Sequence, residues 1–420
     1  MTSSGITHPA RALLRASVMA AALLGGCGHG ASVVPASPGL QLTQNDQSLT
    51  AGGLGGFTSS DPIAAGGAPV CGPVAGDHMR CLSWLSAGAS SQPGDASPDR
   101  LAGYHPADLQ SAYALPSTTR GGGQTIAIVL LADDPNMEGD LHQYRLEFGL
   151  SPCETANRCF KKVNQRGVRG NYPPPDPNWG FEASIDTDMV SAVCPKCHIL
   201  VVEADNDTVQ NAAASVDEAV RLGADVVVVP FGGTDWSTNS HYKHPGHVIV
   251  ASAGDDGYRG GPLFPAGSQY VVAAGGTDLR RSPNPRGWVE TVWPHDTSGC
   301  GLEPKPSWQH DGRCAKRTIA DIAASADIRH GVSVYDTFGT YGWSVAGGTG
   351  VSASIIGGVY GLAENASRLV YARGLYLGRS GLNDVTSGNN GSCGGTYLCT
   401  GAIGYDGPTG NGTPNGIHGF

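Results

Sequence analysis

Short apolar runs without polar alternation recur along the chain from residue 101 onward, and small or turn-forming residues follow each of them. An apolar run that does not alternate is typical of a strand covered on both faces, which indicates a parallel sheet. The runs occupy residues 125–131, 199–202, 226–229, 248–251 and 270–274.

Helical patterns lie between these runs, at residues 136–148, 182–193 and 208–222. This order of strands and helices predicts an α/β domain whose parallel β-sheet is covered by helices on both faces. In such a domain the functional site forms at the carboxyl ends of the strands. We expect three glycine-containing turns at that edge, namely Gly232-Gly233, Gly254-Asp255 and residues 347–350.

Residues 347–360 form the most distinctive stretch, in which a glycine-rich turn opens a helix. Small residues leave the free N–H groups of the first helical turn accessible, and the positive end of the helix dipole favours a developing oxyanion there. A hydrolase would place its nucleophile at such a turn. The same composition also suits a helix start against which another segment packs closely.

An acidic pair, Glu182 and Asp186, stands one helical turn apart on one face of a predicted helix. The same face continues as Met189, Val190 and Val193, whereas Asp188 lies on the other side. An acidic pair at this spacing is usually a solvated helix face, but the apolar continuation indicates that both carboxylates point inward. When they are buried side by side, the like charges raise one pKa of the pair, so the pair can accept a proton in acid solution.

The amino-acid composition indicates an exported protein and argues against nucleic acid as a partner. The chain has 420 residues, of which only 15% are charged, together with 63 glycines and a formal net charge of -10. This is typical of an exported protein with many turns, and it argues against nucleic-acid binding. Residues 27–100 are rich in Gly, Ser, Ala and Pro, so we expect a low-complexity leader that does not fold alone.

The N-terminus is predicted to be an export signal over residues 1–26. Arg11 and Arg15 precede the apolar run 16–24, which is too short to remain in a bilayer. The run ends in Leu-Gly-Gly-Cys27, which resembles the bacterial lipobox, so Cys27 is expected to carry the lipid. Ordinary cleavage nearby, with secretion, is the alternative to a lipid-anchored cell-envelope protein.

The number and spacing of the cysteines agree with export. Of the eleven cysteines, removal of Cys27 leaves ten that fall into sequence-local pairs, and short-loop disulfides are the preferred interpretation in an oxidising compartment. The Cys194-Pro-Lys-Cys197 motif could instead be a redox or zinc site, but it ends a predicted helix and precedes a strand, and no second such motif exists. The predicted pairs are Cys71–Cys81, Cys153–Cys159, Cys194–Cys197, Cys300–Cys314 and Cys393–Cys399.

Three segments together resemble the sedolisin, or serine-carboxyl peptidase, family over residues 101–420. The family places a glutamate and, four residues on, an aspartate on one helix, which Glu182 and Asp186 match. Asp255, within Ser-Ala-Gly-Asp255, matches the aspartic acid that faces the oxyanion. The resemblance implies a subtilisin-like fold, with Glu182 as general base, Asp186 as its proton relay and a protonated Asp255 as oxyanion donor.

The nucleophile segment departs from this pattern. The family has Gly-Thr-Ser where this chain has Gly-Thr-Gly350, so glycine occupies the nucleophile position. Ser352 is the alternative nucleophile, although it lies about 200° around the helix from residue 350, and Ser354 lies a full turn deeper. Val229 and Pro230 also stand where the family has small polar residues beside the substrate groove.

A further likeness concerns calcium. The family holds this ion with two carboxylates and three backbone carbonyls, and oxygen-only ligands on turning backbone suit it. Two turn aspartates without a metal are the alternative interpretation. The matching residues are Asp384, Val385, Ala402, Gly404 and Asp406.

The sequence therefore predicts an exported sedolisin homologue whose endopeptidase activity is impaired or lost because of Gly350. The alternative is an active, acid-range endopeptidase that uses Ser352. We expect a monomer that takes a peptide or protein as substrate or ligand, has calcium as its cofactor, does not bind nucleic acid and meets the membrane only through a lipid anchor at Cys27.

Overall fold

The computed structural model describes residues 66–87, 101–235 and 240–420. The export signal, Cys27 and most of the low-complexity leader lie outside the described residues. No helix within the described residues is long and apolar enough to cross a membrane.

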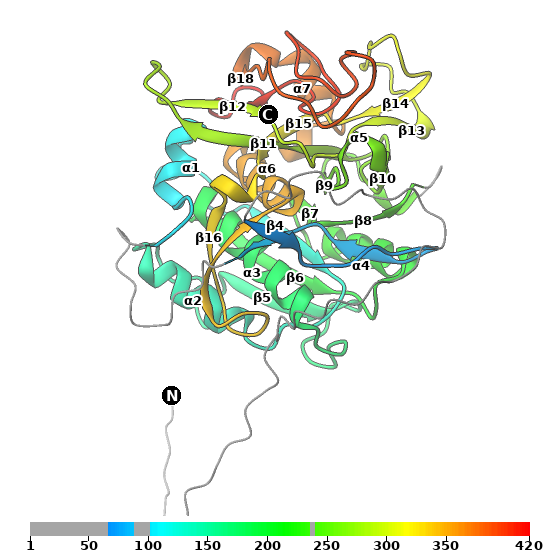
Figure 1. The fold of residues 1–420 in the computed structure, drawn as a ribbon. Coiled ribbons are helices and arrows are strands. Elements are labelled where there is room, and N and C mark those ends of the chain that lie inside the picture. The colour runs from blue at the N-terminus through cyan, green and yellow to red at the C-terminus, as the bar shows by residue number, and fades with distance from the viewer. Residues whose placement is uncertain (1–65, 88–100, 236–239) are drawn as a thin grey trace, which may run out of the picture. The chain divides into compact units, whose positions relative to one another are not determined.

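A mostly parallel sheet forms the centre of the fold (Figure 1). Its strands run in the order β12-β11-β9-β7-β4-β6-β5, with β15 paired beside β11, and only the β11–β12 pair is antiparallel. The strands are β4 Thr125–Leu130, β5 Phe160–Asn164, β6 His198–Glu203, β7 Val226–Val229, β9 Val248–Ser252, β11 Val272–Arg281, β12 Trp288–Val292 and β15 Ile322–Ser325.

The prediction of a parallel sheet is confirmed, since each apolar run contains or overlaps a central strand. All four residues of β7 are buried, as expected for a strand covered on both faces. The sequence missed β5, which pairs only with β6 at the edge of the sheet and carries two lysines. An edge strand with one open side lacks the continuous apolar signal of its neighbours.

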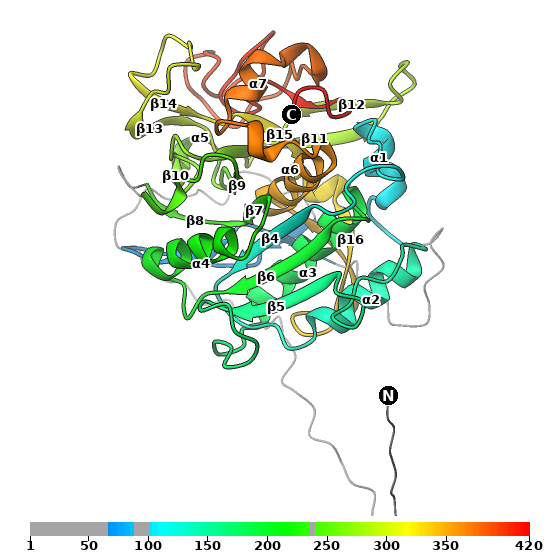
Figure 2. The same cartoon turned by 180° about the vertical axis from the view of Figure 1, so that it is seen from behind.

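Helices cover both faces of this sheet. Figure 2 shows α4 lying over β4 and β6, whereas α3 and α6 pack together on the opposite face. The predicted α/β architecture, a mostly parallel sheet with helices on both faces, is therefore confirmed. The helices are α1 Pro106–Ala112, α2 Met137–Glu147, α3 Pro177–Val193, α4 Val209–Arg221, α5 Gly257–Gly260, α6 Thr349–Ala363 and α7 Arg373–Leu377, with 3₁₀ turns at Ser240–Tyr242, Ile328–His330, Ala366–Arg368 and Arg379–Gly381.

Helix α3 begins five residues before the predicted start at residue 182. Asp176 caps it by accepting hydrogen bonds from the N–H groups of Asn178 and Trp179, and Pro177 takes the first helical position. Proline suits that position because its missing N–H group would have no partner there. The preceding prolines obscured this start in the sequence.

Residues 66–87 differ from the expectation of a structureless leader. They form three short strands, β1 Gly67–Pro69, β2 Met79–Cys81 and β3 Trp84–Ser86. These strands complete two small sheets of the domain, with the orders β1-β3-β17-β16 and β10-β8-β2. The remaining strands are β8 Phe231–Thr234, β10 Leu263–Phe264, β13 Gly299–Pro304, β14 Lys316–Ile319, β16 Val332–Asp336, β17 Gly342–Gly347, β18 Leu382–Asn383 and β19 Thr413–Pro414.

All five predicted disulfides are confirmed, each joining the sequence-local pair that cysteine parity indicated. Cys194 directly follows α3 and Cys197 directly precedes β6, so this motif closes a helix-to-strand turn. Five disulfides are consistent with an oxidising compartment.

Candidate active-site groove

The start of α6 and the middle of α3 bring the candidate catalytic positions together. Gly348 precedes α6 with a φ of 101°, a backbone conformation that favours glycine. In the first turn of α6, Gly350 faces Glu182 so closely that a Cβ atom on this glycine would collide with Glu182 Oε1. One turn further along each helix, the Ser354 hydroxyl donates to Asp186 Oδ1 at 2.6 Å.

Glu182 and Asp186 are both fully buried. Burial is the main cause that raises the pKa of each carboxyl well above its usual range, and the nearby Asp186 raises that of Glu182 further. The hydroxyls of Ser83 and Ser354 act in the opposite direction, on Glu182 and Asp186 respectively. Neither Glu182 oxygen, nor Asp186 Oδ2, has a partner in full hydrogen-bond geometry among the described residues.

Asp255 completes the group of acids at this edge of the sheet. It follows β9, is 5% exposed, and accepts hydrogen bonds at Oδ1 from the Thr349 N–H at 2.9 Å and the Thr349 hydroxyl at 2.7 Å. Burial raises the pKa of Asp255 to about 6, although both Thr349 donors and the positive charge of Arg80 lower it. At mildly acidic pH this carboxyl is therefore protonated and can donate a hydrogen bond.

Ser352 does not reach this group. Its hydroxyl donates to the Gly275 carbonyl at 2.6 Å and accepts from the Ala324 N–H at 2.9 Å. Both partners belong to the central sheet, on β11 and β15, so the side chain faces away from Glu182. Thr349 is likewise engaged with Asp255. No serine of α6 in the described structure presents a hydroxyl at the position of residue 350.

The space between β8 and β17, beside the start of α6, is here called the groove. Residues 66–87 occupy it, and sequence reasoning missed this. Strand β2 pairs antiparallel with β8, and β3 pairs antiparallel with β17. Between these strands, the Leu82 carbonyl accepts a hydrogen bond from the Gly350 N–H at 2.7 Å. The one local signal was the Cys71–Cys81 pair, which gave no indication of where the loop would dock.

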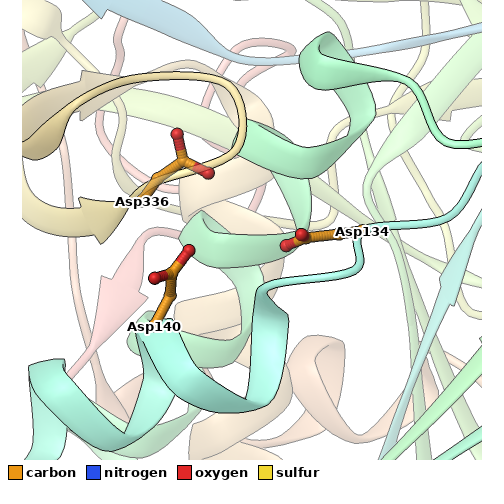
Figure 3. A group of neighbouring side chains, drawn as sticks. All are labelled: Asp134, Asp140 and Asp336. Atoms are coloured by element: carbon orange, nitrogen blue, oxygen red, sulfur yellow. The ribbon is translucent and has the colours of Figure 1, made fainter. Parts of the chain in front are cut away.

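A second acidic cluster lies on another side of α3. Asp134, Asp140 and Asp336 are buried with their carboxylate oxygens within 4.8 Å of one another, and Figure 3 shows Asp134 pointing toward the other two. Burial is the main cause that raises the pKa of Asp134 to about 8 and that of Asp140 to about 6. These oxygens could hold a small hard cation or share a proton.

The predicted calcium residues also come together. The Gly404 N–H donates to Asp384 Oδ2 and the Ala402 N–H donates to Asp406 Oδ2, each at 2.9 Å. Burial is the main cause that raises the pKa of Asp406 to about 7, and the charge of Asp384 adds to it. Two carboxylates on turning backbone are a donor set that fits calcium, and a cation here would relieve their repulsion.

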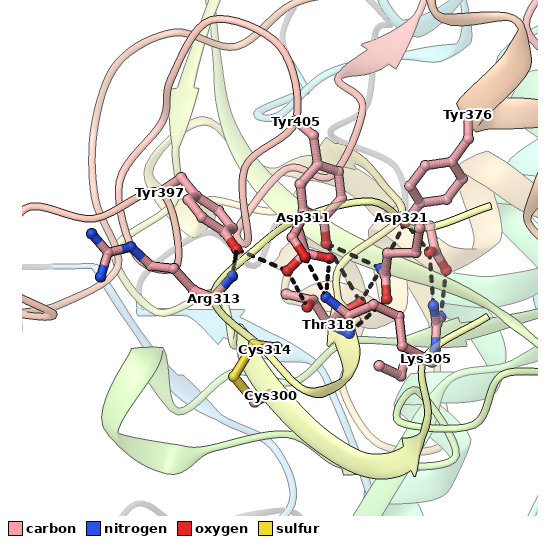
Figure 4. A network of polar contacts seen from close by, with 12 residues as sticks. Cys300, Lys305, Asp311, Arg313, Cys314, Thr318, Asp321, Tyr376, Tyr397 and Tyr405 are labelled. Carbon is pink, nitrogen blue, oxygen red and sulfur yellow. Dashed lines mark hydrogen bonds and ion pairs between the residues drawn. A yellow bond between two sulfur atoms is a disulfide. The ribbon is translucent and has the colours of Figure 1, made fainter. Parts of the chain in front are cut away.

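A polar network beside this turn holds the C-terminal region in place (Figure 4). Asp311 accepts from the Thr318 and Tyr397 hydroxyls, each at 2.8 Å. Asp321 forms a buried ion pair with Arg317 and accepts from the Tyr376 hydroxyl at 2.7 Å. The network borders a pocket of about 290 Å³, lined by Trp308, His310, Asp311, Tyr376, Arg379, Tyr397, Tyr405 and Asn411.

The described residues thus form an α/β domain with buried acids at the carboxyl edge of its mostly parallel sheet. The chain is 29% identical over 388 residues to kumamolisin from Bacillus sp. (strain MN-32), covering 82% of this chain and 67% of kumamolisin. It is 26% identical over 361 residues to sedolisin from Pseudomonas sp. (strain 101), covering 74% of this chain and 60% of sedolisin. No family model matches the chain.

A solved structure agrees on the fold. Pseudomonas sedolisin, a serine-carboxyl proteinase complexed with two molecules of pseudo-iodotyrostatin, aligns with a TM-score of 0.63 at 23% identity. The alignment covers 75% of this chain and 96% of the sedolisin chain. Homology to kumamolisin and sedolisin, with this shared fold, supports the sedolisin family that the motifs predicted.

Proposed function

We propose that this protein is an exported sedolisin-family homologue that has lost most or all of its endopeptidase activity. The observation that carries the proposal is the position of Gly350, which faces Glu182 and follows Thr349, the hydrogen-bond partner of Asp255, but carries no hydroxyl. A base, its acidic partner and an oxyanion donor act as a unit with a nucleophile, so without one they give little catalysis. The oxyanion site alone would leave a residual acceleration of about 10³ to 10⁴-fold over water.

The alternative, an active peptidase with Ser352 as nucleophile, has little geometric support. The Ser352 hydroxyl already bonds to two backbone groups of the central sheet. To reach Glu182 it would have to leave both partners and turn around the helix. A buried N–H or carbonyl left without a partner costs about 1 to 3 kcal/mol.

Calcium and the export route belong to the same proposal. We infer that Asp384 and Asp406, with the backbone carbonyls of Val385, Ala402 and Gly404, bind one calcium ion that stabilises the C-terminal turn. We also infer that residues 1–26 are removed on export and that Cys27 is lipidated. Mass analysis of protein from membranes should show both changes, and a soluble mature chain that begins elsewhere would contradict the lipid anchor.

The decisive test is hydrolysis of a denatured protein by purified material from about pH 3 to pH 7. We expect the wild type to be nearly inert and indistinguishable from Glu182→Gln. Serine-directed acylating inhibitors should leave the wild-type mass unchanged. Rapid cleavage by the wild type that Ser352→Ala abolishes would overturn the proposal and establish the displaced nucleophile.

A further inference from the structure

We propose that residues 66–87, here called the groove segment, are a built-in peptide ligand that permanently fills the groove in the orientation of a substrate. This inference rests on the proposed function, because a groove with an intact nucleophile would cut such an occupant. It names the ligand of the groove as a segment of the same chain. Figure 1 shows this segment in blue beside β8.

Main-chain pairing runs along the whole groove. On one side of Leu82, Met79, Arg80 and Cys81 pair with Gly233, Gly232 and Phe231 of β8. On the other side, Trp84 and Leu85 pair with Gly347 and Ala346 of β17. A peptide that adds a strand to an exposed sheet edge gains affinity in this way, so the segment is bound as an extended peptide would be.

The Leu82–Ser83 peptide bond lies at the position where a substrate would react. The Leu82 N–H donates to the Pro230 carbonyl at 3.1 Å, and the Leu82 carbonyl accepts from the Gly350 N–H at 2.7 Å. A Cβ atom on Gly348 would lie 2.5 Å from that carbonyl oxygen and 2.9 Å from Asp255 Oδ2, so the two oxygens border the same point. The carbonyl therefore occupies the site of a developing oxyanion.

Side chains anchor the segment on both sides of this bond. Leu82 is 1% exposed and packs with Leu263 over the bare backbone of Gly232. Trp84 is 6% exposed and contacts Trp293 edge-on, with ring centroids 5.9 Å apart. A buried tryptophan removes a large apolar area from water, which marks it as the main anchor.

Charge and a disulfide add to this binding. Arg80 on β2 forms an ion pair with Asp256, the neighbour of the oxyanion aspartate. The Cys71–Cys81 disulfide joins β2 to the preceding loop across a sequence separation of 10. This link limits the conformations of the released segment, which lowers the entropy cost of docking it again.

The glycine at position 350 leaves space for the groove segment and carries no group that could cut it. A Cβ atom at residue 350 would lie 2.9 Å from the Leu82 carbonyl oxygen and would collide with Glu182 Oε1. The Ser83 hydroxyl instead lies near Glu182 and lowers the pKa of its carboxyl. The glycine thus leaves room for the Leu82 carbonyl and leaves the Leu82–Ser83 bond without an attacking group.

The first test measures whether the groove segment stays bound between β8 and β17, and it does not depend on catalysis. In hydrogen exchange of the full chain, the amides of the groove segment should be protected as strongly as those of β8 and β17. Trp84→Ala should speed exchange in all three by about 100-fold, because a lost buried tryptophan costs several kcal/mol. Trp308→Ala, a half-buried tryptophan of the C-terminal pocket, is the matched control and should leave them protected.

The second test determines which peptide bond of the groove segment lies beside residue 350, that is, the register of the segment in the groove. In Gly350→Ser, the introduced hydroxyl would attack the Leu82 carbonyl carbon while Glu182 accepts its proton. The C–N bond to Ser83 then breaks, the Ser83 amine takes that proton, and water hydrolyses the resulting ester. We expect a new N-terminus at Ser83 in this variant, at a rate independent of concentration, and none in the wild type, Gly350→Ala or the Gly350→Ser, Glu182→Gln double variant.

The outcomes separate the two proposals. Fast exchange of the groove segment in the wild type would overturn the built-in ligand while leaving Gly350 without a hydroxyl, so the proposed function would stand. A cut elsewhere in the segment, or an uncut Gly350→Ser chain with a protected segment, would overturn the register. Cleavage of added protein by the wild type is the separate result that overturns the proposed function.

Discussion

The two sides of α3 both carry buried acids, yet they are built differently. Toward α6, Glu182 and Asp186 have a single hydroxyl donor in full hydrogen-bond geometry, from Ser354, among the described residues. Toward β16, Asp336 accepts from the N–H groups of Gly339 and Thr340 and from the Ser184 hydroxyl.

The other acids on this second side are also held by donors. Asp140 accepts from the N–H and hydroxyl of Thr337 at 2.8 and 2.7 Å, and Asp188 accepts from the Tyr335 N–H at 3.0 Å. The β16–β17 hairpin is thereby tied to α2 and α3. Here the acids hold backbone in place.

This difference teaches that a raised pKa does not by itself identify a functional acid. Burial raises the pKa of Asp188 on one side as well as that of Glu182 on the other. What separates the sides is the supply of donors, because an acid without donors keeps its oxygens available for a proton from elsewhere. The α6 side fits proton transfer and the β16 side fits structure.

The largest expected effect comes from removing an acid on the donor-rich side. Asp336→Ala would leave two N–H groups and one hydroxyl without their acceptor, and each such group costs about 1 to 3 kcal/mol. We expect the free energy of unfolding to fall by about 3 kcal/mol or more, measured by urea denaturation at pH 7.

Glu182→Gln is the matched variant on the donor-poor side. Burial and the nearby Asp186 raise the pKa of Glu182 well above its usual range. Glutamine has nearly the same shape, and neither Glu182 oxygen has a partner in full hydrogen-bond geometry to lose among the described residues. The free energy of unfolding should change by less than about 1 kcal/mol. Equal losses in the two variants would break the comparison between the two sides.

The proposed calcium site at Asp384 and Asp406 adds a third acidic group to the comparison. Calcium is expected to stabilise the protein by an intermediate amount. If Asp384 and Asp406 bind calcium, saturating ion at about 100 times its dissociation constant should stabilise the protein by about 2.7 kcal/mol. Chelation should lower the melting temperature by several degrees, and Asp406→Asn should abolish that response. Asp134→Asn should preserve it, whereas a response lost only in Asp134→Asn would move the metal to the cluster in Figure 3.

The last comparison concerns the pH dependence of the free energy of unfolding. Burial raises the pKa of Asp134 to about 8 and of Asp255 to about 6, so the folded state binds these protons more tightly than the unfolded chain. Their stabilising contribution is full below about pH 4 and is lost as pH rises through the folded-state values, by about 1.4 kcal/mol per pH unit for each group.

Denaturation at several pH values between 4 and 8 checks this sign. Asp134→Asn should flatten the decline up to about pH 8, and Asp255→Asn should flatten it up to about pH 6. A wild type that grows more stable from pH 4 to pH 8 would contradict the raised values of both acids.

Local sequence determined the central sheet and one side of the site. Apolar runs without polar alternation, such as residues 226–229, form strands of the central sheet. A strand that is covered on both faces is apolar along its whole length. Glu182 and Asp186 share a helix face with Met189 and Val193, so their burial followed from helical periodicity alone. Cysteine parity identified five disulfides for a similar reason, since each pair is close along the chain.

Tertiary structure alone decided where the groove segment lies and how the second acidic cluster forms. Residues 66–87 carry too little apolar surface to fold alone, and they gain order from backbone partners on β8 and β17, far along the chain. Asp134, Asp140 and Asp336 likewise come from a loop, a helix and a strand end. Periodicity describes neighbours along one element, whereas these contacts arise only when separate elements pack together.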